Sequence, residues 1–265
     1  MNLHKAEIIG LKPLSLGWNL LTLKPEEKVD FGPGQFVFLR LSKMMDPLLR
    51  RPFSVHCFYR NSNQLEILFQ EKGRGTRMMK DYRSGQIIDF LGPLGKGFTL
   101  NKNIKRAVIV GGGIGVAPLF FLARELHGSG ILFDFLMGAS TKTLIPDLDY
   151  FQKAETSPFL ATDDGSHGFK GTVTALFRNM YCSSGHNKAV DMIYACGPTP
   201  MLSSLYREAK SLKIPIEVSM ESNMACGVGA CLGCVCETKK EVSGEISYSR
   251  VCKEGPVFPG EAVFF

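Results

Sequence analysis

The sequence lacks the features that mark membrane, secreted and nucleic-acid-binding proteins. None of its apolar stretches reaches the length of a membrane-spanning helix without polar breaks. Its first residues do not follow the signal-peptide pattern. Its 31 basic residues are scattered, without a long run or interleaved aromatic residues. We therefore expect a cytoplasmic protein that binds neither membranes nor nucleic acids.

The usual arrangements for side-chain catalysis are absent from the sequence as well. There is no nucleophile elbow and no pair of catalytic carboxylates, and the histidines are too widely separated to form a metal pattern or a nucleophile–base pair. Reactions that move hydride or electrons between cofactors need positioning and tuned potentials, and they do not need a side-chain acid or base. We therefore expect no catalytic side chain and look for cofactor-binding motifs.

The composition provides enough apolar material for a large core. Hydrophobic residues make up 45% of the 265 positions and charged residues 21%, which suits two domains and a small appendage. The net charge of +6 favours anionic cofactors or an acidic partner, but it also fits a basic surface without a role. Eight cysteines in a chain of this length fit a reducing compartment better than a small disulfide scaffold.

The most informative motif is a set of four cysteines near the C-terminus: Cys226, Cys231, Cys234 and Cys252. The first three have the C-x4-C-x2-C spacing of plant-type ferredoxins, and four thiolates are what a [2Fe–2S] cluster needs. The glycines between them allow the backbone angles of a loop wrapped around a cluster. Structural zinc is the alternative, although zinc ribbons favour paired C-x2-C knuckles. The spacing of Cys236 argues against that residue as a competing ligand.

Residues 1–101 are expected to form an antiparallel β-barrel. Short alternating or apolar runs are separated there by glycine, proline and asparagine. The expected strands are Lys5–Leu11, Trp18–Lys24, Gln35–Leu41, Phe53–Tyr59, Gln64–Phe69 and Gln86–Leu91. One short helix is expected at Arg77–Tyr82, directly after Gly75 and Thr76.

Residues 102–218 have a different pattern, in which strands alternate with helices and predict a parallel α/β sheet. The expected strands are Arg106–Val110, Ile131–Met137, Pro158–Thr162, Asp191–Ala195 and Ile216–Ser219, and the expected helices are Val116–His127 and Pro200–Leu212. Residues 219–265 follow directly and contain the four cysteines. The predicted fold is therefore a β-barrel, then a parallel-sheet α/β domain, then a small C-terminal cluster-binding segment.

Two short motifs in the barrel have the chemistry of a flavin dinucleotide site. The run Arg51-Pro52-Phe53-Ser54 begins a strand. Its arginine can make two hydrogen bonds to a pyrophosphate, and its serine hydroxyl can reach a flavin ring edge. Gly75 and Thr76 offer backbone N–H groups and a hydroxyl at a helix N-terminus, which suits a phosphate. An arginine that only caps a strand is the alternative explanation of the first motif.

Two glycine turns lie at one edge of the predicted α/β sheet. Gly111-Gly112-Gly113-Ile114-Gly115 joins a strand to a helix, where dinucleotide sites form in open α/β sheets. Its match to the G-x-G-x-x-G fingerprint is imperfect, because Val116 replaces the last glycine. Cys196-Gly197-Pro198 follows a later strand at the same edge. Together the turns predict a crevice for a nicotinamide nucleotide, although a tight structural turn would also explain the first.

The combination of a flavin barrel, a nucleotide-binding domain and a ferredoxin-like cluster resembles the ferredoxin–NAD(P) reductase superfamily over the whole chain. Three regions narrow the resemblance to the electron-transfer subunits of B-type dihydroorotate dehydrogenase. They are the cluster loop from Glu221 to Cys234, the fourth-ligand segment from Arg250 to Phe258, and Thr162-Asp163-Asp164-Gly165-Ser166 with Lys170-Gly171-Thr172-Val173-Thr174.

The resemblance implies cofactors, site residues and a partner. FAD-binding residues would be Arg51, Pro52, Phe53, Ser54, Leu68, Phe69, Gln70, Gly75 and Thr76, and the [2Fe–2S] ligands would be Cys226, Cys231, Cys234 and Cys252. The implied partner is an FMN-containing catalytic subunit that oxidises dihydroorotate in pyrimidine biosynthesis. The complex would be a heterotetramer of both subunits, in which electrons pass from FMN through the cluster and FAD to NAD+.

Other functions fit the same motifs. One is the flavin subunit of another reductase of this architecture, such as sulfide dehydrogenase or a transhydrogenase-type ferredoxin:NADP oxidoreductase. A second is a standalone diaphorase, and a third is a zinc-stabilised module without redox function. The amino-acid sequence of the cluster loop favours the dihydroorotate complex. We expect that loop to face the partner subunit through residues such as Val228 and Leu232.

Overall fold

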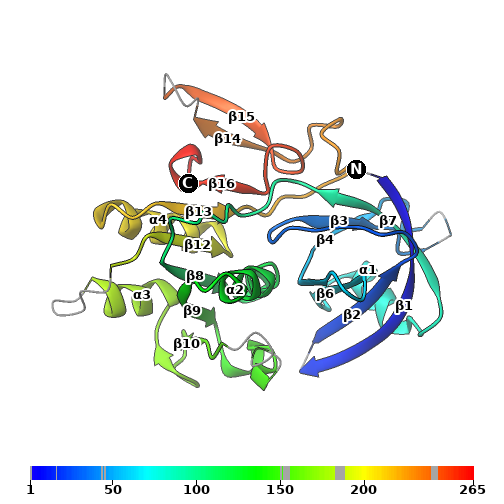
Figure 1. The fold of residues 1–265 in the computed structure, drawn as a ribbon, viewed down its shortest axis with the longest axis horizontal. Helices are drawn as coiled ribbons and strands as arrows, with labels where there is room; N and C mark the ends of the chain where they lie inside the picture. Colours follow the sequence, from blue (N-terminus) through cyan, green and yellow to red (C-terminus); the bar gives the residue numbers. More distant parts are fainter. Residues whose placement is uncertain are drawn as a thin grey trace.

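The computed structural model describes residues 2–15, 17–42, 44, 46–149, 151, 156–182, 189–239 and 244–265. Within these ranges the strands form two seven-stranded sheets and one two-stranded sheet. The large sheets lie next to each other, with helix α2 (Leu119–Gly128) between them, and the small sheet lies at the top of the view (Figure 1).

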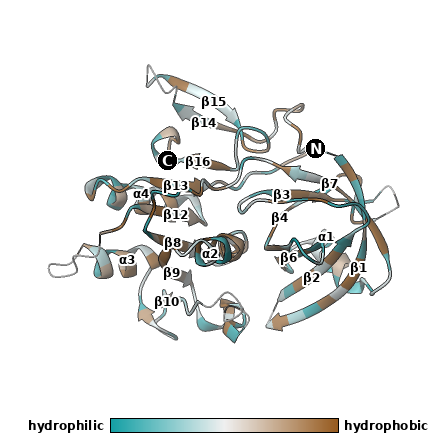
Figure 2. Ribbon diagram, in the orientation of Figure 1, coloured by the Kyte–Doolittle hydropathy of each residue, from teal (hydrophilic) through white to brown (hydrophobic). Residues whose placement is uncertain are grey.

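The first sheet is antiparallel and has the strand order β4-β3-β7-β1-β2-β6-β5. Its strands are β1 (Asn2–Ser15), β2 (Trp18–Pro25), β3 (Phe36–Leu39), β4 (Arg51–Ser54), β5 (Cys57–Tyr59), β6 (Gln64–Gln70) and β7 (Ile87–Leu94). Hydrophobic and hydrophilic residues alternate along β1 (Figure 2), as expected of a strand with one buried face. Trp18, Phe31 and Phe90 fill the interior.

The predicted strand Phe53–Tyr59 is two strands, because the chain changes partner within it. β4 pairs with β3, and Val55 next donates its N–H to the Gln35 carbonyl oxygen over 2.9 Å. His56 then donates its N–H to the Glu66 carbonyl oxygen over 2.9 Å, and β5 pairs with β6. This switch brings the two ends of the sheet together and gives the predicted barrel.

The short helix after β6 begins earlier than the predicted Arg77–Tyr82. Helix α1 covers Arg74–Met78, and a 3₁₀ turn, η1, covers Met79–Asp81. The Thr76 hydroxyl oxygen accepts the N–H of Gly73 over 3.1 Å. Gly73 is therefore the N-cap of the helix, and Thr76 lies inside the first turn instead of before it.

The second sheet has the order β11-β10-β9-β8-β12-β13-β16 and is parallel except for β16. Its strands are β8 (Arg106–Gly112), β9 (Leu132–Ala139), β10 (Phe159–Thr162), β11 (Phe169–Lys170), β12 (Met192–Cys196), β13 (Ile216–Ser219) and β16 (Val257–Pro259). Helices α2, α3 (Val173–Tyr181) and α4 (Thr199–Ser211) cover it, together with 3₁₀ turns η2 (Gly113–Val116), η3 (Lys142–Leu144) and η5 (Gly260–Ala262). The predicted parallel α/β domain is confirmed.

The two faces of this sheet belong to different hydrophobic clusters. On β8, Ile109 packs in the cluster that contains α2 and the barrel interior, whereas Val110 packs with α3 and α4. Helix α2 thus shares one continuous core with the barrel. Its predicted start at Val116 is wrong, because Val116 belongs to η2 and Pro118 is the N-cap of α2.

Several elements have no counterpart in the sequence-based prediction. Helix α3 begins after Thr172, whose hydroxyl oxygen accepts the N–H of Ala175 over 3.1 Å. The cysteine segment forms the hairpin β14 (Val235–Lys239) and β15 (Ile246–Arg250), and its last strand, β16, pairs antiparallel with β13. The segment is therefore built into the second sheet. In the described part of the chain, no helix combines the length and apolar character needed to cross a membrane.

Candidate cofactor sites

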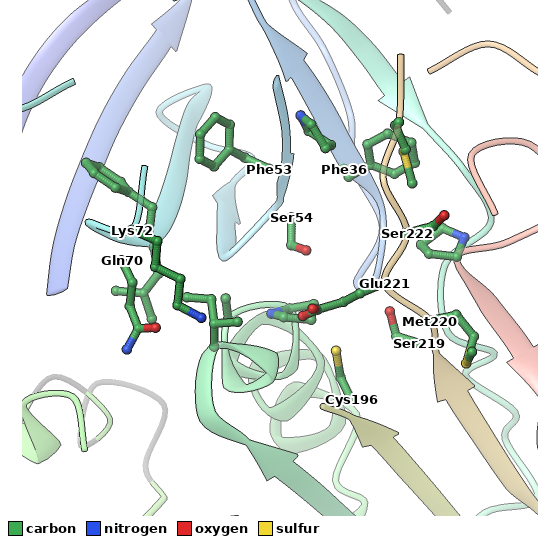
Figure 3. A pocket seen from close by; sticks show the side chains of 18 of the residues that line it. Phe36, Phe53, Ser54, Gln70, Lys72, Cys196, Ser219, Met220, Glu221 and Ser222 are labelled. Atoms are coloured by element: carbon green, nitrogen blue, oxygen red, sulfur yellow. The ribbon is translucent and has the colours of Figure 1, made fainter. Parts of the chain in front are cut away.

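A cavity of about 310 Å³ lies where the barrel, the second sheet and the cysteine segment meet. The barrel contributes residues such as Phe53 and Ser54 from β4, and the ends of β12 and β13 contribute Cys196 and Ser219. Figure 3 shows the Ser54 hydroxyl and the Cys196 thiol on opposite sides of this space. Met224 and Pro256, from the cysteine segment, also line it. All three parts of the chain therefore border one cavity.

Most residues predicted to bind FAD line this cavity. They are Pro52, Phe53, Ser54, Leu68, Phe69, Gln70 and Thr76. The rings of Phe53 on β4 and Phe69 on β6 meet edge to face with centroids 6.2 Å apart, so two strands that are not paired with each other form an aromatic wall. The apolar lining with a few hydroxyl and amide groups suits a flat heteroaromatic ring.

Arg51 and Gly75 are the predicted FAD residues that do not line the cavity. The Arg51 guanidinium donates to the Leu49 carbonyl oxygen over 2.8 Å. Gly75 lies beside Arg51, because a Cβ added at Gly75 would be 3.7 Å from Arg51 Cγ and 2.7 Å from Leu41 Cδ1. The structure thus brings these two residues together, next to Thr76 at the cavity wall.

A second cavity, of about 500 Å³, lies at the carboxyl edge of the second sheet. Gly112, Gly113 and Pro198, from the two predicted glycine turns, line it. The wall between the two cavities is shared, because both are lined by Gln70, Lys72, Ile114 and Glu221. A nucleotide in the second cavity would therefore reach a ring held in the first.

Gly111, Gly115 and Gly197 line neither cavity. A Cβ added at Gly115 would lie 2.3 Å from the Cys196 carbonyl oxygen, and one added at Gly111 would lie 2.7 Å from Val116 Cγ1. Gly115 allows the first turn to approach the second, and Gly111 leaves room for the residues that follow it in the first turn, so both have a packing role. Gly197 has a φ of 159°, so its backbone is nearly extended.

The Cys196 thiol faces the first cavity but is not a reactive nucleophile. Burial is the main cause that raises the pKa of Cys196 to about 12, and the nearby Glu221 carboxylate adds to the effect. The thiol is therefore neutral at physiological pH. Lys72 and Glu221, in contrast, are exposed and provide the charges at the shared wall.

His56 fixes the start of α2 to the barrel. Its Nδ1 lies 2.6 Å from the Ala117 carbonyl oxygen, and because a carbonyl only accepts, Nδ1 is the donor. Its ring stacks on Phe120 with centroids 4.7 Å apart. Burial is the main cause that lowers the pKa of His56 to about 4. Ala117 lines the first cavity, so the neutral imidazole holds one wall of the cavity against the strands that form the other.

The cysteine loop directs backbone N–H groups toward sulfur atoms. Each such contact spans 3.4 Å, and the contacts are Val228 to Cys226 Sγ, Gly233 to Cys231 Sγ and Cys252 to Cys234 Sγ. The hydrogen bond from Val228 is the main cause that lowers the pKa of Cys226 to about 6. At Cys226 the loop therefore favours the thiolate, the form that binds iron.

The four predicted ligands form two pairs. Besides the Val228 N–H, Cys231 is among the groups that lower the pKa of Cys226, and Cys252 donates its N–H to Cys234 Sγ over 3.4 Å. In the part of the chain that the structure describes, no three His, Cys, Asp or Glu side chains are grouped for one ion. A [2Fe–2S] centre takes two protein ligands on each iron. The residues present thus fit a cluster with two irons.

Cys236 does not join these pairs. It lies on β14, and burial is the main cause that raises the pKa of its thiol. Burial also raises the pKa of the predicted ligand Cys252, to about 12. The pKa therefore does not separate these two cysteines, and only the sequence spacing sets Cys236 aside.

Sequence reasoning missed several residues that border the cavities. Glu221 follows β13 and Asp163 follows β10, and both reach the cavities at the carboxyl edge of the sheet. A search at the end of every predicted parallel strand would have found both, since ligands bind outside the carboxyl ends of such strands.

Comparisons with known families match two separate parts of the chain. A family model described as the iron–sulfur cluster binding domain of dihydroorotate dehydrogenase B matches residues 221–264. A model described as an oxidoreductase FAD-binding domain matches residues 16–98. These matches cover most of the cysteine segment and most of the barrel.

A solved structure and curated relatives resemble the chain over most of its length. The NADH-dependent reduced ferredoxin-NADP oxidoreductase has a TM-score of 0.83 and 28% identity, covering 98% of this chain and 89% of its own. A protein of Geobacillus sp. (strain WCH70) is 40% identical over 237 residues, 87% of this chain and 86% of its own. A protein of Desulforamulus reducens is 41% identical over 227 residues, which cover 86% of this chain and 84% of its own. Both relatives are named electron transfer subunits of dihydroorotate dehydrogenase B (NAD(+)), and the chain belongs to this family.

Proposed function

We propose that this chain is the electron transfer subunit of a dihydroorotate dehydrogenase B in the synthesis of pyrimidines. Its redox chemistry would be supplied by a [2Fe–2S] cluster and FAD, which pass electrons from the FMN of a catalytic subunit to NAD+. We assign residues 1–101 to FAD, 102–218 to NAD and 219–265 to the cluster. The chain itself is an oxidoreductase subunit, and dihydroorotate oxidation takes place on its partner.

The observation that carries this proposal is the first cavity, which all three parts of the chain border. Met224 and Pro256 link it to the cysteine segment, and Ile114 and Glu221 link it to the second cavity. The arrangement suits a flavin between an electron donor on one side and a nucleotide on the other. The chain's own residues position and shield these groups, and no acid or base is required.

NAD is the preferred acceptor on the chemistry of the second cavity. Asp163 follows β10 and lines this cavity beside Ser140. A carboxylate can accept a hydrogen bond from a ribose hydroxyl, and it repels the additional phosphate of NADP. We therefore assign Asp163 as the residue that favours NAD.

An apolar patch beside the cluster loop suits the partner subunit. Leu232 lies between two cysteine ligands with 61% exposure and a left-handed φ of 57°, which is uncommon for a leucine. Val235, Ile246 and Tyr248 on the hairpin are also exposed. We propose that the FMN-containing catalytic subunit covers this patch, because electron transfer needs the two redox centres close together. A cytoplasmic heterotetramer is the proposed assembly.

The patch is tested by Leu232→Asp, because aspartate tolerates the left-handed conformation. We expect this change to reduce co-purification with the catalytic subunit. Leu132→Asp is the control, since Leu132 is 65% exposed on β9, in a different part of the fold. Equal recovery of the partner with both variants would contradict the assigned interface.

The function as a whole is tested by spectroscopy and by a coupled assay. The purified chain should carry flavin and iron–sulfur absorption bands. Co-expressed with an FMN-containing catalytic subunit, it should support dihydroorotate-dependent reduction of NAD+. A colourless protein that contains zinc would refute the redox proposal. A chain with both cofactors that supports no such reduction would refute the assignment to dihydroorotate.

A second candidate function follows from the solved structure with a TM-score of 0.83, an NADH-dependent reduced ferredoxin-NADP oxidoreductase. A chain of that kind would transfer electrons between NADH and a ferredoxin-linked partner. Reduction of NAD+ by dihydroorotate with the FMN subunit favours the first function. Transfer that requires ferredoxin and ignores dihydroorotate favours the second.

A further inference from the structure

Arg250 makes contacts on both sides of the cysteine site. Its Nη1 donates to the Gly229 carbonyl oxygen over 2.9 Å. Gly229 lies in the loop between Cys226 and Cys231. The same guanidinium donates from Nε to Glu254 Oε2 over 3.0 Å, and Nη2 also binds that carboxylate. One side chain thus joins the first cysteine loop to the segment that contains the fourth cysteine.

The backbone around Arg250 belongs to the other cysteine pair. Val251, the next residue, donates its N–H to the Cys234 carbonyl oxygen over 3.0 Å, and Cys252 donates to Cys234 Sγ over 3.4 Å. Arg250 is therefore attached through its main chain to the Cys234–Cys252 pair. Through its guanidinium it is attached to the loop of the Cys226–Cys231 pair.

Gly229 is shaped to accept this contact. Its φ is 81°, and a Cβ there would lie 3.3 Å from Arg250 Nη1 and 2.8 Å from Lys253 Cδ. Glu254 in turn fixes the plane of the guanidinium, because it also accepts the backbone N–H of Arg250 over 2.7 Å.

We propose that Arg250 is a positioning residue that ties the Cys226–Cys231 loop to the Cys234–Cys252 segment and so holds the two ligand pairs at the spacing of the cluster. Glu254 orients the guanidinium for this contact. The inference rests on the proposed function, since it requires that the cysteines bind a [2Fe–2S] cluster. It assigns a role to two residues of the fourth-ligand segment besides Cys252.

The test compares Arg250→Gln, Arg250→Lys and Glu254→Gln in the full chain purified with its cofactors. The readouts are iron and sulfide per chain, the rate at which a chelator removes iron–sulfur absorbance, and the EPR signal of the dithionite-reduced cluster. Arg250→Gln should lose the cluster about 10- to 100-fold faster, as for other outer contacts of metal ligands. Arg250→Lys should not rescue it, because an ammonium cannot reproduce the planar fork. Glu254→Gln should have a smaller effect, since the contact to Gly229 remains.

Lys253→Gln is the matched control, because it removes a positive charge next to Cys252 but keeps the part of the stem that packs on Gly229. Lys253→Gln should lose its cluster to the chelator at the wild-type rate and should retain the wild-type EPR signal. FAD content should be unchanged in every variant. If Arg250→Gln is insoluble, the test uses Arg250→Lys and Glu254→Gln. Both should lose the cluster faster than the wild type, and Glu254→Gln should show the smaller acceleration.

Two results would overturn the inference. One is that Arg250→Gln loses its cluster to the chelator at the wild-type rate and has the wild-type EPR signal. If Arg250→Gln is insoluble, the same result in both Arg250→Lys and Glu254→Gln would overturn the inference. The other is the same acceleration in Lys253→Gln as in the Arg250 variants, which would make the effect one of charge alone. A wild-type chain that never acquires iron and sulfide would instead refute the proposed function, so the two failures are distinguishable.

Discussion

Gly115→Ala should destabilise the nucleotide half of the protein without removing a ligand contact. The added Cβ would lie 2.3 Å from the Cys196 carbonyl oxygen and 2.7 Å from Gly197 Cα. Both atoms belong to the backbone at the end of β12, which pairs with β8 and β13 on either side. Neither atom can rotate away as a flexible side chain would. The turn that contains Gly115 and the turn after β12 must therefore move apart.

The size of the effect follows from these contacts. Overpacking by one carbon in a close-packed site costs about 1 to 3 kcal/mol. Because the clash is with backbone at sub-van-der-Waals distance, we expect the upper end, about 3 kcal/mol. That free energy corresponds to an increase on the order of 100-fold in the local opening equilibrium.

Native-state hydrogen exchange of peptides that cover β8 and β12 measures this opening directly. Exchange should accelerate in Gly115→Ala. It should not accelerate in the control Gly128→Ala, because nothing lies within 4 Å of a Cβ added at the end of α2. NADH affinity should fall along with the protection. If exchange is the same in both variants while NADH binding is lost only in Gly115→Ala, then Gly115 is a ligand contact and the packing explanation is wrong.

Other expectations concern nucleotide choice, pH and the cluster. Asp163→Asn should reduce the preference for NAD over NADP by about 10- to 100-fold, since a hydrogen bond to a charged group is lost. The ratio of kcat/KM for the two nucleotides measures this preference. Asp164→Asn, which alters a carboxylate bonded to Ser166, should leave the ratio unchanged. His56 has its pKa lowered to about 4, so the unfolded chain binds more protons below pH 6.5. Its contribution of on the order of 3 kcal/mol is therefore present above pH 6.5 and is lost as the pH falls toward 4. The melting temperature of His56→Gln should accordingly fall less steeply with decreasing pH than that of the wild type. Parallel plots of melting temperature against pH for the two proteins would contradict the role given to His56. Cys252→Ser should abolish the iron–sulfur absorbance and keep the flavin, whereas Cys236→Ser should change neither; loss of the cluster in both would reopen the choice of the fourth ligand.

The order of the three parts could be predicted from the sequence because its signals are local, and the cluster ligands are a prediction that rests on the same kind of signal. The spacing of Cys226, Cys231 and Cys234 reflects a single loop, and the change from short alternating runs to strands separated by helices reflects local periodicity. The two glycine turns could be predicted for the same reason. Helix α3 and the hairpin escaped prediction, because their formation depends on packing against α4 and against the end of the chain.

The roles of individual glycines could not be read from the motif that contains them. Gly112 and Gly113 line the second cavity, whereas Gly111 packs against Val116 of its own turn and Gly115 packs against the turn after β12. The motif has the same appearance in both cases, because glycine is required wherever a backbone comes close, whether the neighbour is a ligand or another strand.

What the sequence by itself determined is therefore the set of chemical groups and the parts of the chain that contain them. Only the tertiary structure decided which groups meet. Lys72, Ile114 and Glu221 come from distant parts of the chain and border one cavity, and Arg250 reaches Gly229 in the cysteine loop. Such contacts depend on how β16 joins the second sheet and how α2 packs on the barrel, and no local pattern records them, because they arise from burial of surfaces far apart in the chain.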